Sequence, residues 1–177
     1  MILLISFSIN PKSKSYKAIN NAHNYLKSIH IDSELIDMRK YELPFYDGTD
    51  EVLNNETVKK LFNNFSKAEK IIIGSPIYNF DVNAVLKNFI DLLSVMRYRH
   101  KSNKKQIIGV IGAMGNKKSF ASLLPSLSNF QFSLGLYLIP KIVMCTPKDF
   151  DEKDEVNIDL ENRIIELCNT MVNHIVN

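Results

Sequence analysis

The chain has 177 residues, of which 45% are hydrophobic and 23% charged, a composition typical of one globular domain with a substantial core. Its formal net charge of +3 is small and its lysines are scattered, so we expect no nucleic acid partner. The apolar start MILLISF is too short for a signal peptide or a membrane span and predicts a first strand instead. Cys145 and Cys168 lie far apart, which favours reduced thiols and a cytoplasmic location.

Hydrophobic periodicity predicts ten elements along the chain. Continuous or alternating apolar runs predict strands over residues 1–7, 31–38, 70–74, 106–112 and 136–144. Apolar positions at helical spacing predict helices over residues 16–29, 54–66, 82–93, 119–133 and 155–176. We expect Ser15 to cap the first helix, and we expect Pro125 and Pro140 to disturb the fourth helix and the last strand.

The strict alternation of strand and helix predicts an α/β fold built on a five-stranded parallel sheet with helices on both faces. For five strands the usual doubly wound order is 2-1-3-4-5, and we expect residues 1–177 to form one such domain. Ligands bind this class of sheet at the carboxyl ends of the strands, where the strand order reverses. The loops over residues 8–15, 76–81 and 112–118 are therefore the candidate ligand loops.

The first of these loops carries three serines and two lysines just before a helix. A helix N-terminus offers unpaired N–H groups and a positive dipole end, which suits a phosphate. The loop has no glycine, which argues against both a P-loop and a dinucleotide fingerprint. An ordinary polar loop with a serine cap is the alternative interpretation. The second loop is apolar, aromatic and amide-bearing, and it suits a flat heteroaromatic ligand.

These loops resemble those of the NADPH-dependent FMN reductases, a family of the flavodoxin-like superfamily. Residues 8–15, SINPKSKS, are similar to the S-x-x-x-x-S-x-S phosphate loop of that family. Residues 76–79, PIYN, followed by residues 86–91, LKNFID, resemble its most specific signature, and residues 43–47, LPFYD, resemble its L-P-x-[FY]-D segment. The resemblance runs from residue 1 to about residue 145 and implies a flavodoxin-like fold that binds FMN.

The resemblance also implies a role for each loop. The phosphate of FMN would be bound by Ser8, Ser13 and Ser15, with help from Lys14. The isoalloxazine ring would be bordered by Pro76, Ile77, Tyr78 and Asn79. Backbone contacts near its pyrimidine edge would come from Gly112, Ala113, Met114, Gly115 and Asn116. Hydride transfer between stacked rings needs no side-chain acid or base, so we expect no catalytic residue, and the four scattered histidines predict no metal site.

Two departures from the family pattern bear on the second substrate. Phe80 occupies a position where the family usually has glycine, and the larger side chain could narrow the second-substrate side of the pocket. Asn83 and Ala84 replace a common Pro-Gly pair. The basic segment over residues 97–105 has two interpretations, a solvated connector or a contact to nucleotide phosphates or a partner subunit.

Taken together, these features predict an FMN-dependent NAD(P)H oxidoreductase. It would pass a hydride from NADPH or NADH to flavin and on to a small acceptor such as free flavin, a quinone or an azo compound. As in many members of the family, we expect a homodimer or homotetramer. The alternatives are a flavodoxin-like electron carrier and a binding or regulatory protein on the same fold. Flavodoxin-like carriers are usually strongly acidic and carry a T-x-[ST]-G-x-T loop. The sequence pI near 8.7 and the absence of that loop pattern in this sequence argue against a carrier.

Overall fold

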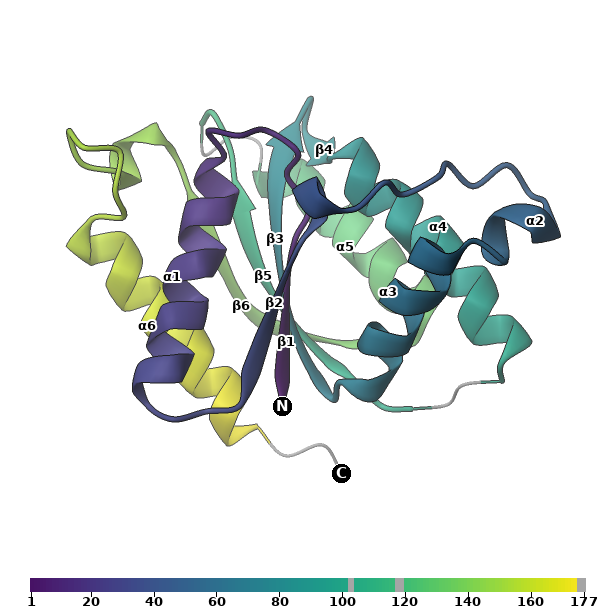
Figure 1. Cartoon of the computed structure of the whole chain (residues 1–177). Helices are drawn as coiled ribbons and strands as arrows, with labels where there is room; N and C mark the ends of the chain where they lie inside the picture. The colour runs from purple at the N-terminus through teal and green to yellow at the C-terminus, as the bar shows by residue number, and fades with distance from the viewer. Residues whose placement is uncertain (102–103, 117–119, 175–177) are drawn as a thin grey trace.

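The computed structural model describes residues 1–101, 104–116 and 120–174 (Figure 1). The strands are β1 (Ile2–Ser6), β2 (Ser33–Asp37), β3 (Lys70–Tyr78), β4 (Asp81–Val82), β5 (Ile107–Ala113) and β6 (Tyr137–Cys145). The helices are α1 (Lys14–Ser28), α2 (Asp50–Leu53), α3 (Glu56–Lys67), α4 (Ala84–Arg99), α5 (Phe120–Leu134) and α6 (Ile158–Asn173). None of the helices in these ranges is long and apolar enough to cross a bilayer.

The central sheet has the predicted topology. Its order is β2-β1-β3-β5-β6 with every neighbouring pair parallel, which is the expected 2-1-3-4-5 arrangement once the short β4 is set aside. Strand β4 was not predicted; it pairs antiparallel with the far end of β3. The order reverses between β1 and β3, so the loops that follow these two strands open at the same edge of the sheet.

Alternate residues of the central strands feed two separate cores. Leu3 and Ile71 point to the core shared with α3, α4 and α5, whereas Leu4 and Ile72 point to the core shared with α1 and α6. Figure 1 shows α1 and α6 on one side of the sheet and the other long helices opposite. Each such side chain contributes about 1.5–3 kcal/mol when it is fully buried, which explains why these runs are apolar at every position.

Strand β3 is longer than predicted. The sequence suggested a loop from Ser75, because Pro76 and the polar residues after it are typical of turns. In the structure Ser75 and Pro76 continue the parallel ladder opposite Gly112 and Ala113 of β5. The chain then reverses at Asn79 and Phe80, whose φ angles of 49° and 67° give the left-handed two-residue turn typical of hairpins.

Several element ends also differ from the prediction. Ser13, and not Ser15, caps α1, because its Oγ accepts a hydrogen bond from the N–H of Tyr16 at 3.0 Å. The second predicted helix corresponds to α3, the short α2 before it was not predicted, and the last helix begins three residues later than predicted. Pro125 lies inside α5 without ending it, whereas Pro140 coincides with a register shift in the edge strand β6. Residues 117–119, predicted as loop end and helix start, lie outside the described residues.

Candidate functional site

A cavity of about 440 Å³ opens at the carboxyl edge of the sheet. Ten of the thirteen residues expected to contact FMN line it: Ser8, Ser13, Lys14, Ser15, Pro76, Ile77, Tyr78, Ala113, Met114 and Gly115. The structure therefore brings all three predicted loops to one cavity. A volume in this range suits a cofactor-sized ligand. Four further lining residues were not expected from the sequence: Asn10, Lys12, Cys145 and Pro147.

The three other predicted residues lie beside the cavity. Asn79 forms the tip of the β3–β4 hairpin, and Asn116 is exposed beyond the end of β5. Gly112 lies under the cavity floor, where an added Cβ would come within 2.9 Å of the Met144 methyl group. These positions shape the cavity, although their side chains do not line it.

The serine loop forms the deep end of the cavity at the start of α1. Ser8, Ser13 and Ser15 are all buried, and the Oγ atoms of Ser13 and Ser15 lie 2.9 Å apart. Ser8 Oγ accepts a hydrogen bond from the N–H of Asn10, which folds the loop back on itself. Because no Asp or Glu lines the cavity in the described part of the chain, hydroxyls, lysines and the helix N-terminus dominate its electrostatics. This end can accept an anion.

Lys14 is engaged by a carboxylate from the far end of the chain. Asp154 forms ion pairs with Lys14 and with Lys17, the latter at 2.7 Å, and the Lys14 ammonium lies 4.2 Å from the centre of the Phe150 ring. The hydrogen bonds from Lys14 and Lys17 lower the pKa of Asp154 to about 2. The predicted help of Lys14 to a phosphate is therefore shared with this carboxylate.

Replacing Asp154 by Asn should strengthen anion binding in the cavity. The change removes one negative charge next to Lys14 and Lys17, and asparagine tolerates the φ of 60° at this position. We expect about fivefold tighter FMN binding, since an exposed charge at this range has a modest effect in water. Fluorescence titration measures it, with Glu152→Gln in the same loop as control. Equal affinities for both variants would contradict this role.

The same carboxylate makes stability depend on acid pH. The pKa of Asp154 is lower in the folded protein than in the unfolded chain, so its ion pairs stabilise the fold above pH 4. That contribution is lost as the pH falls from about 4 through about 2. Thermal melts across this window should show a smaller loss for Asp154→Asn than for the wild type.

Two buried asparagines hold the ligand loops in place. Asn83 donates from Nδ2 to the carbonyl of Phe7 at 2.8 Å, while its Oδ1 accepts from the N–H of Leu86 and from Ser75 Oγ. Asn88 accepts from the N–H of Tyr46 and donates to the carbonyl of Pro44, both at 2.9 Å. Asn83 was recognisable as a helix cap; its bond to Phe7 was not.

Tyr78 of the β3–β4 hairpin lines the cavity, whereas Phe80 in the turn of the hairpin is not one of the lining residues. Tyr78 and Phe80 are each 54% exposed, and the hairpin is tied to α5 by a hydrogen bond from Ser126 to the Asp81 carboxylate. On the opposite side, burial raises the pKa of the Cys145 thiol to about 12, so it stays protonated at neutral pH. Cys145 and Cys168 are both buried free thiols, as predicted. No metal-binding group of His, Cys, Asp or Glu occurs within the described ranges.

The described basic residues of segment 97–105 lie in the last turn of α4 and just after it, at the other end of the sheet. Arg99 pairs with Asp50, and the ring of His100 stacks on Phe62 with centroids 5.1 Å apart. Arg97 is buried, and Lys101 is exposed. Because α4 begins at the edge of the sheet where the first cavity opens and runs 16 residues away from it, these cations are remote from that cavity.

The fold and the cavity together define a flavodoxin-like α/β protein with an anion-accepting site at the point where the strand order reverses. Among solved structures, the NAD(P)H:(acceptor) oxidoreductase FerB from Paracoccus denitrificans has a TM-score of 0.74, with 17% identity over 98% of this chain and 97% of that one. A flavodoxin from the domain Archaea has a TM-score of 0.61, with 12% identity over 98% of this chain and 100% of that one.

Residues 1–151 match the sequence profile of the NADPH-dependent FMN reductases, and the chain belongs to this family. An NAD(P)H-dependent FAD/FMN reductase of Geobacillus thermodenitrificans is 27% identical over 78% of this chain and 72% of its own length. An FMN-dependent NADH:quinone oxidoreductase of Metamycoplasma arthritidis is 30% identical over 64% of this chain and 65% of its own. An NADPH azoreductase of a Bacillus species is 28% identical over 64% and 61%. The matched regions therefore span about two thirds of these relatives.

Proposed function

We propose that this protein is an FMN-dependent NAD(P)H oxidoreductase that passes a hydride from nicotinamide to flavin and on to a small acceptor. The observation that carries the proposal is the joining of a serine-lined helix N-terminus and an aromatic hairpin in one cavity. The first element suits the phosphate of FMN and the second its flat ring. Relatives named as quinone, azo and flavin reductases support the same class of acceptor.

The residues of the cavity fit FMN. The hydroxyls of Ser8, Ser13 and Ser15, with the first N–H groups of α1, would hold the phosphate, and Lys14 would share its charge between that phosphate and Asp154. Ile77 and Tyr78 would border the ring on the hairpin side. At the pyrimidine edge the N–H of Met114 already donates to the carbonyl of Cys145 at 2.9 Å. No atom lies within 4 Å of the place where a Cβ of Gly115 would be, so a ligand can approach its backbone, and its N–H is the better placed donor.

The mechanism rests on positioning. When bound, FMN would supply the hydride chemistry between nicotinamide and acceptor. The serines at the start of α1 would hold its phosphate, and the buried side chains of Ile77 and Met114 would exclude water from the cavity, which stays open beside the exposed Tyr78. A backbone N–H near the pyrimidine edge would favour negative charge there. Nicotinamide and acceptor would use the open side in turn.

Phe80 offers a test of both backbone strain and acceptor access. Its φ of 67° costs a bulky residue such as phenylalanine about 1–2 kcal/mol, a strain that glycine does not have. We expect Phe80→Gly to be more stable than Phe80→Ala by about 1 kcal/mol in urea unfolding, because both variants lose the ring and only glycine relieves the strain. If the ring limits acceptor size, both variants should show a lower KM for a bulky azo dye. A KM that stays at the wild-type value in both would remove Phe80 from the acceptor site.

An anaerobic absorbance titration tests the proposed activity. Purified protein is first saturated with FMN, and NADPH or NADH is then added without oxygen. Rapid bleaching of the flavin band by either nucleotide, followed by reoxidation with a quinone, is the expected result. Bound flavin that dithionite reduces but neither nucleotide does would favour an electron carrier, and failure to bind micromolar FMN would favour a flavin-free binding protein.

The location and assembly of the protein complete the proposal. The two free, buried thiols agree with a reducing, cytoplasmic location. Phe132 at the end of α5 is 85% exposed, and an aromatic group so exposed supports a homodimer or homotetramer. Size-exclusion chromatography with light scattering measures the oligomeric state, and a monomer at micromolar concentration would contradict this part.

A further inference from the structure

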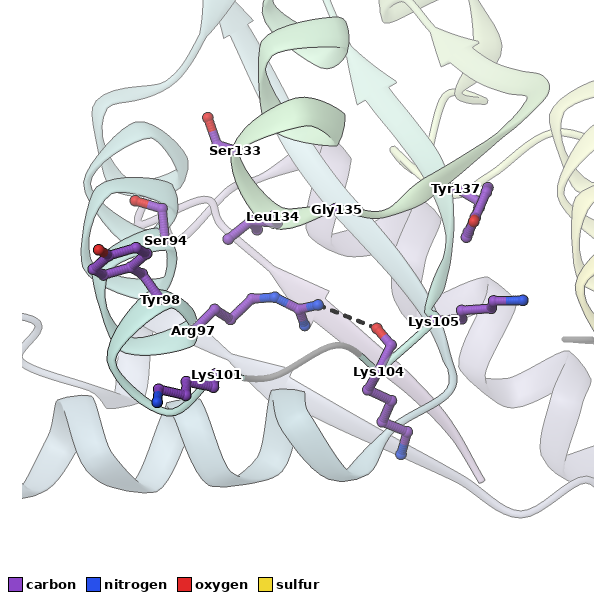
Figure 2. Close-up of a pocket in the computed structure, with 10 residues that line it drawn as sticks. All are labelled: Ser94, Arg97, Tyr98, Lys101, Lys104, Lys105, Ser133, Leu134, Gly135 and Tyr137. Atoms are coloured by element: carbon purple, nitrogen blue, oxygen red, sulfur yellow. Dashed lines mark hydrogen bonds between the residues drawn. The ribbon is translucent and has the colours of Figure 1, made fainter.

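A second cavity, of about 620 Å³, lies at the opposite edge of the sheet from the flavin site. It opens between the last turn of α4, the residues Lys104 and Lys105 before β5, and the turn that joins α5 to β6 (Figure 2). Strand β5 separates the two cavities, and its seven residues span roughly 20 Å. The two cavities share no lining residue. A ligand here would not reach the flavin ring.

The cavity wall is strongly basic. Arg97, Lys101, Lys104 and Lys105 line it, together with two serines and two tyrosines, and no acidic residue lines it in the described part of the chain. The sequence shows the same asymmetry, since residues 92–148 contain nine lysines or arginines and no Asp or Glu. All 19 acidic residues and the other 13 basic residues lie outside this segment. The small net charge of the chain therefore hides an uneven distribution of charge along the sequence.

Arg97 is the unusual member of this group. It is only 6% exposed, and its guanidinium donates to two neutral acceptors, Gln106 Oε1 and, at 3.1 Å, the carbonyl of Lys104. Within the described ranges Arg39, Arg99 and Arg163 each pair with an aspartate, and Arg97 pairs with none. Burial lowers the pKa of Arg97. Because buried charges in proteins are normally paired, this cation lacks the compensation that an anion would supply.

The ends of neighbouring helices offset only part of this charge. Helices α4 and α5 both end beside the cavity, and each helix C-terminus carries about half a negative charge. Lys104 also donates to the carbonyl of Lys67 at 2.6 Å. Even with Lys105 left aside, the three formal positive charges of Arg97, Lys101 and Lys104 exceed the roughly one negative charge of the two helix ends. Interaction with the helix ends therefore does not offset all the positive charge of the cavity.

We propose that this cavity binds a phosphorylated small molecule, with a diphosphate group held by Arg97, Lys101 and Lys104. Phosphate oxygens match a guanidinium and ammonium groups through short, charge-assisted hydrogen bonds. The organic part of the ligand would contact Tyr98 and Tyr137, which line the cavity from α4 and from the start of β6 (Figure 2). The volume is sufficient for a ligand of nucleotide size.

The test is calorimetric titration of the full chain, saturated with FMN, using inorganic pyrophosphate as probe. Saturation with FMN blocks the serine loop, so binding reports on the second cavity. We expect one pyrophosphate per chain, and at least tenfold weaker binding when Lys101→Asn and Lys104→Ser are combined. Asparagine suits the φ of 49° at position 101. The matched control combines Lys27→Ser with Lys60→Ser, two exposed lysines on α1 and α3, and should change affinity less than threefold.

A second measurement locates the ligand without altering the buried arginine. The Nε–Hε NMR signal of Arg97 should move on addition of pyrophosphate to the wild-type protein. ADP should bind at least as tightly as pyrophosphate if the tyrosines contact the organic part. Three results would each overturn the proposal. The first is saturable binding that leaves the Arg97 signal unmoved, and the second is an equal loss of pyrophosphate affinity in the two double-lysine variants. The third is binding of an oligonucleotide but not of pyrophosphate.

Discussion

Replacing Ser13 by Asp should abolish FMN binding at micromolar concentrations while leaving the fold intact. Ser13 caps α1 through its bond to the N–H of Tyr16, and aspartate is an equally good cap, so the helix keeps its stability. The new carboxylate would face the phosphate of FMN at close range. Repulsion between charges about 4 Å apart amounts to about 3–4 kcal/mol in a partly buried setting. This corresponds to a dissociation constant for FMN that is about 100- to 1000-fold larger. Flavin fluorescence titration measures the change.

Two comparisons isolate the charge effect at Ser13. Ser13→Asn also caps the helix but is neutral, and it should bind FMN within about fivefold of the wild type. Riboflavin has the same ring without the phosphate, so its affinity should be the same in both variants. Should Ser13→Asp bind FMN as well as Ser13→Asn does, the phosphate would not lie at the start of α1. A parallel loss of riboflavin binding would instead indicate damage to the cavity.

Replacing Gln106 by Leu should cost about 4 kcal/mol of the free energy of unfolding. Gln106 is fully buried where the chain enters β5, and its Nε2 donates to the carbonyls of Phe65 and Ala68, both at 2.7 Å. Its Oε1 accepts from Arg97. Leucine leaves three buried polar groups without this partner, at about 1–3 kcal/mol each. Since domains are stable by about 5–15 kcal/mol, the loss should be visible as a large fall in the urea midpoint.

The chain offers a matched control for this substitution. Gln131, the only other glutamine, lies half-buried on α5, and the same change to leucine there should alter stability by less than about 0.5 kcal/mol. If the two variants unfold at the same urea concentration, the hydrogen bonds of Gln106 contribute no net stability. The result bears on the second cavity as well, because Gln106 holds Arg97 in position.

Some features of the site were readable from short stretches of sequence. The three serines before α1 and the apolar run of β3 each carry their signal within a few residues, and the alternation of elements leads to the sheet order. The hairpin after Tyr78 was not readable, because Pro76 resembles a turn residue until its pairing with Ala113 is known. The strained φ at Phe80 follows from that hairpin: Asn79 is a residue that favours a left-handed turn, but a phenylalanine at the next position does not indicate one.

The remaining features depend on contacts between distant segments. Asn83 bonds to Phe7 across 76 residues, Gln106 to Phe65 across 41, and Lys14 to Asp154 across 140. A polar residue on a helix or at a strand end has the same local pattern whether it faces water or a buried carbonyl. By itself, the sequence determined the flavodoxin-like topology and the serine loop, because periodicity and helix capping are local. Only the tertiary structure decided which polar groups hold the loops and which carboxylate pairs with Lys14. The packing of distant segments against the sheet brings these groups within bonding distance.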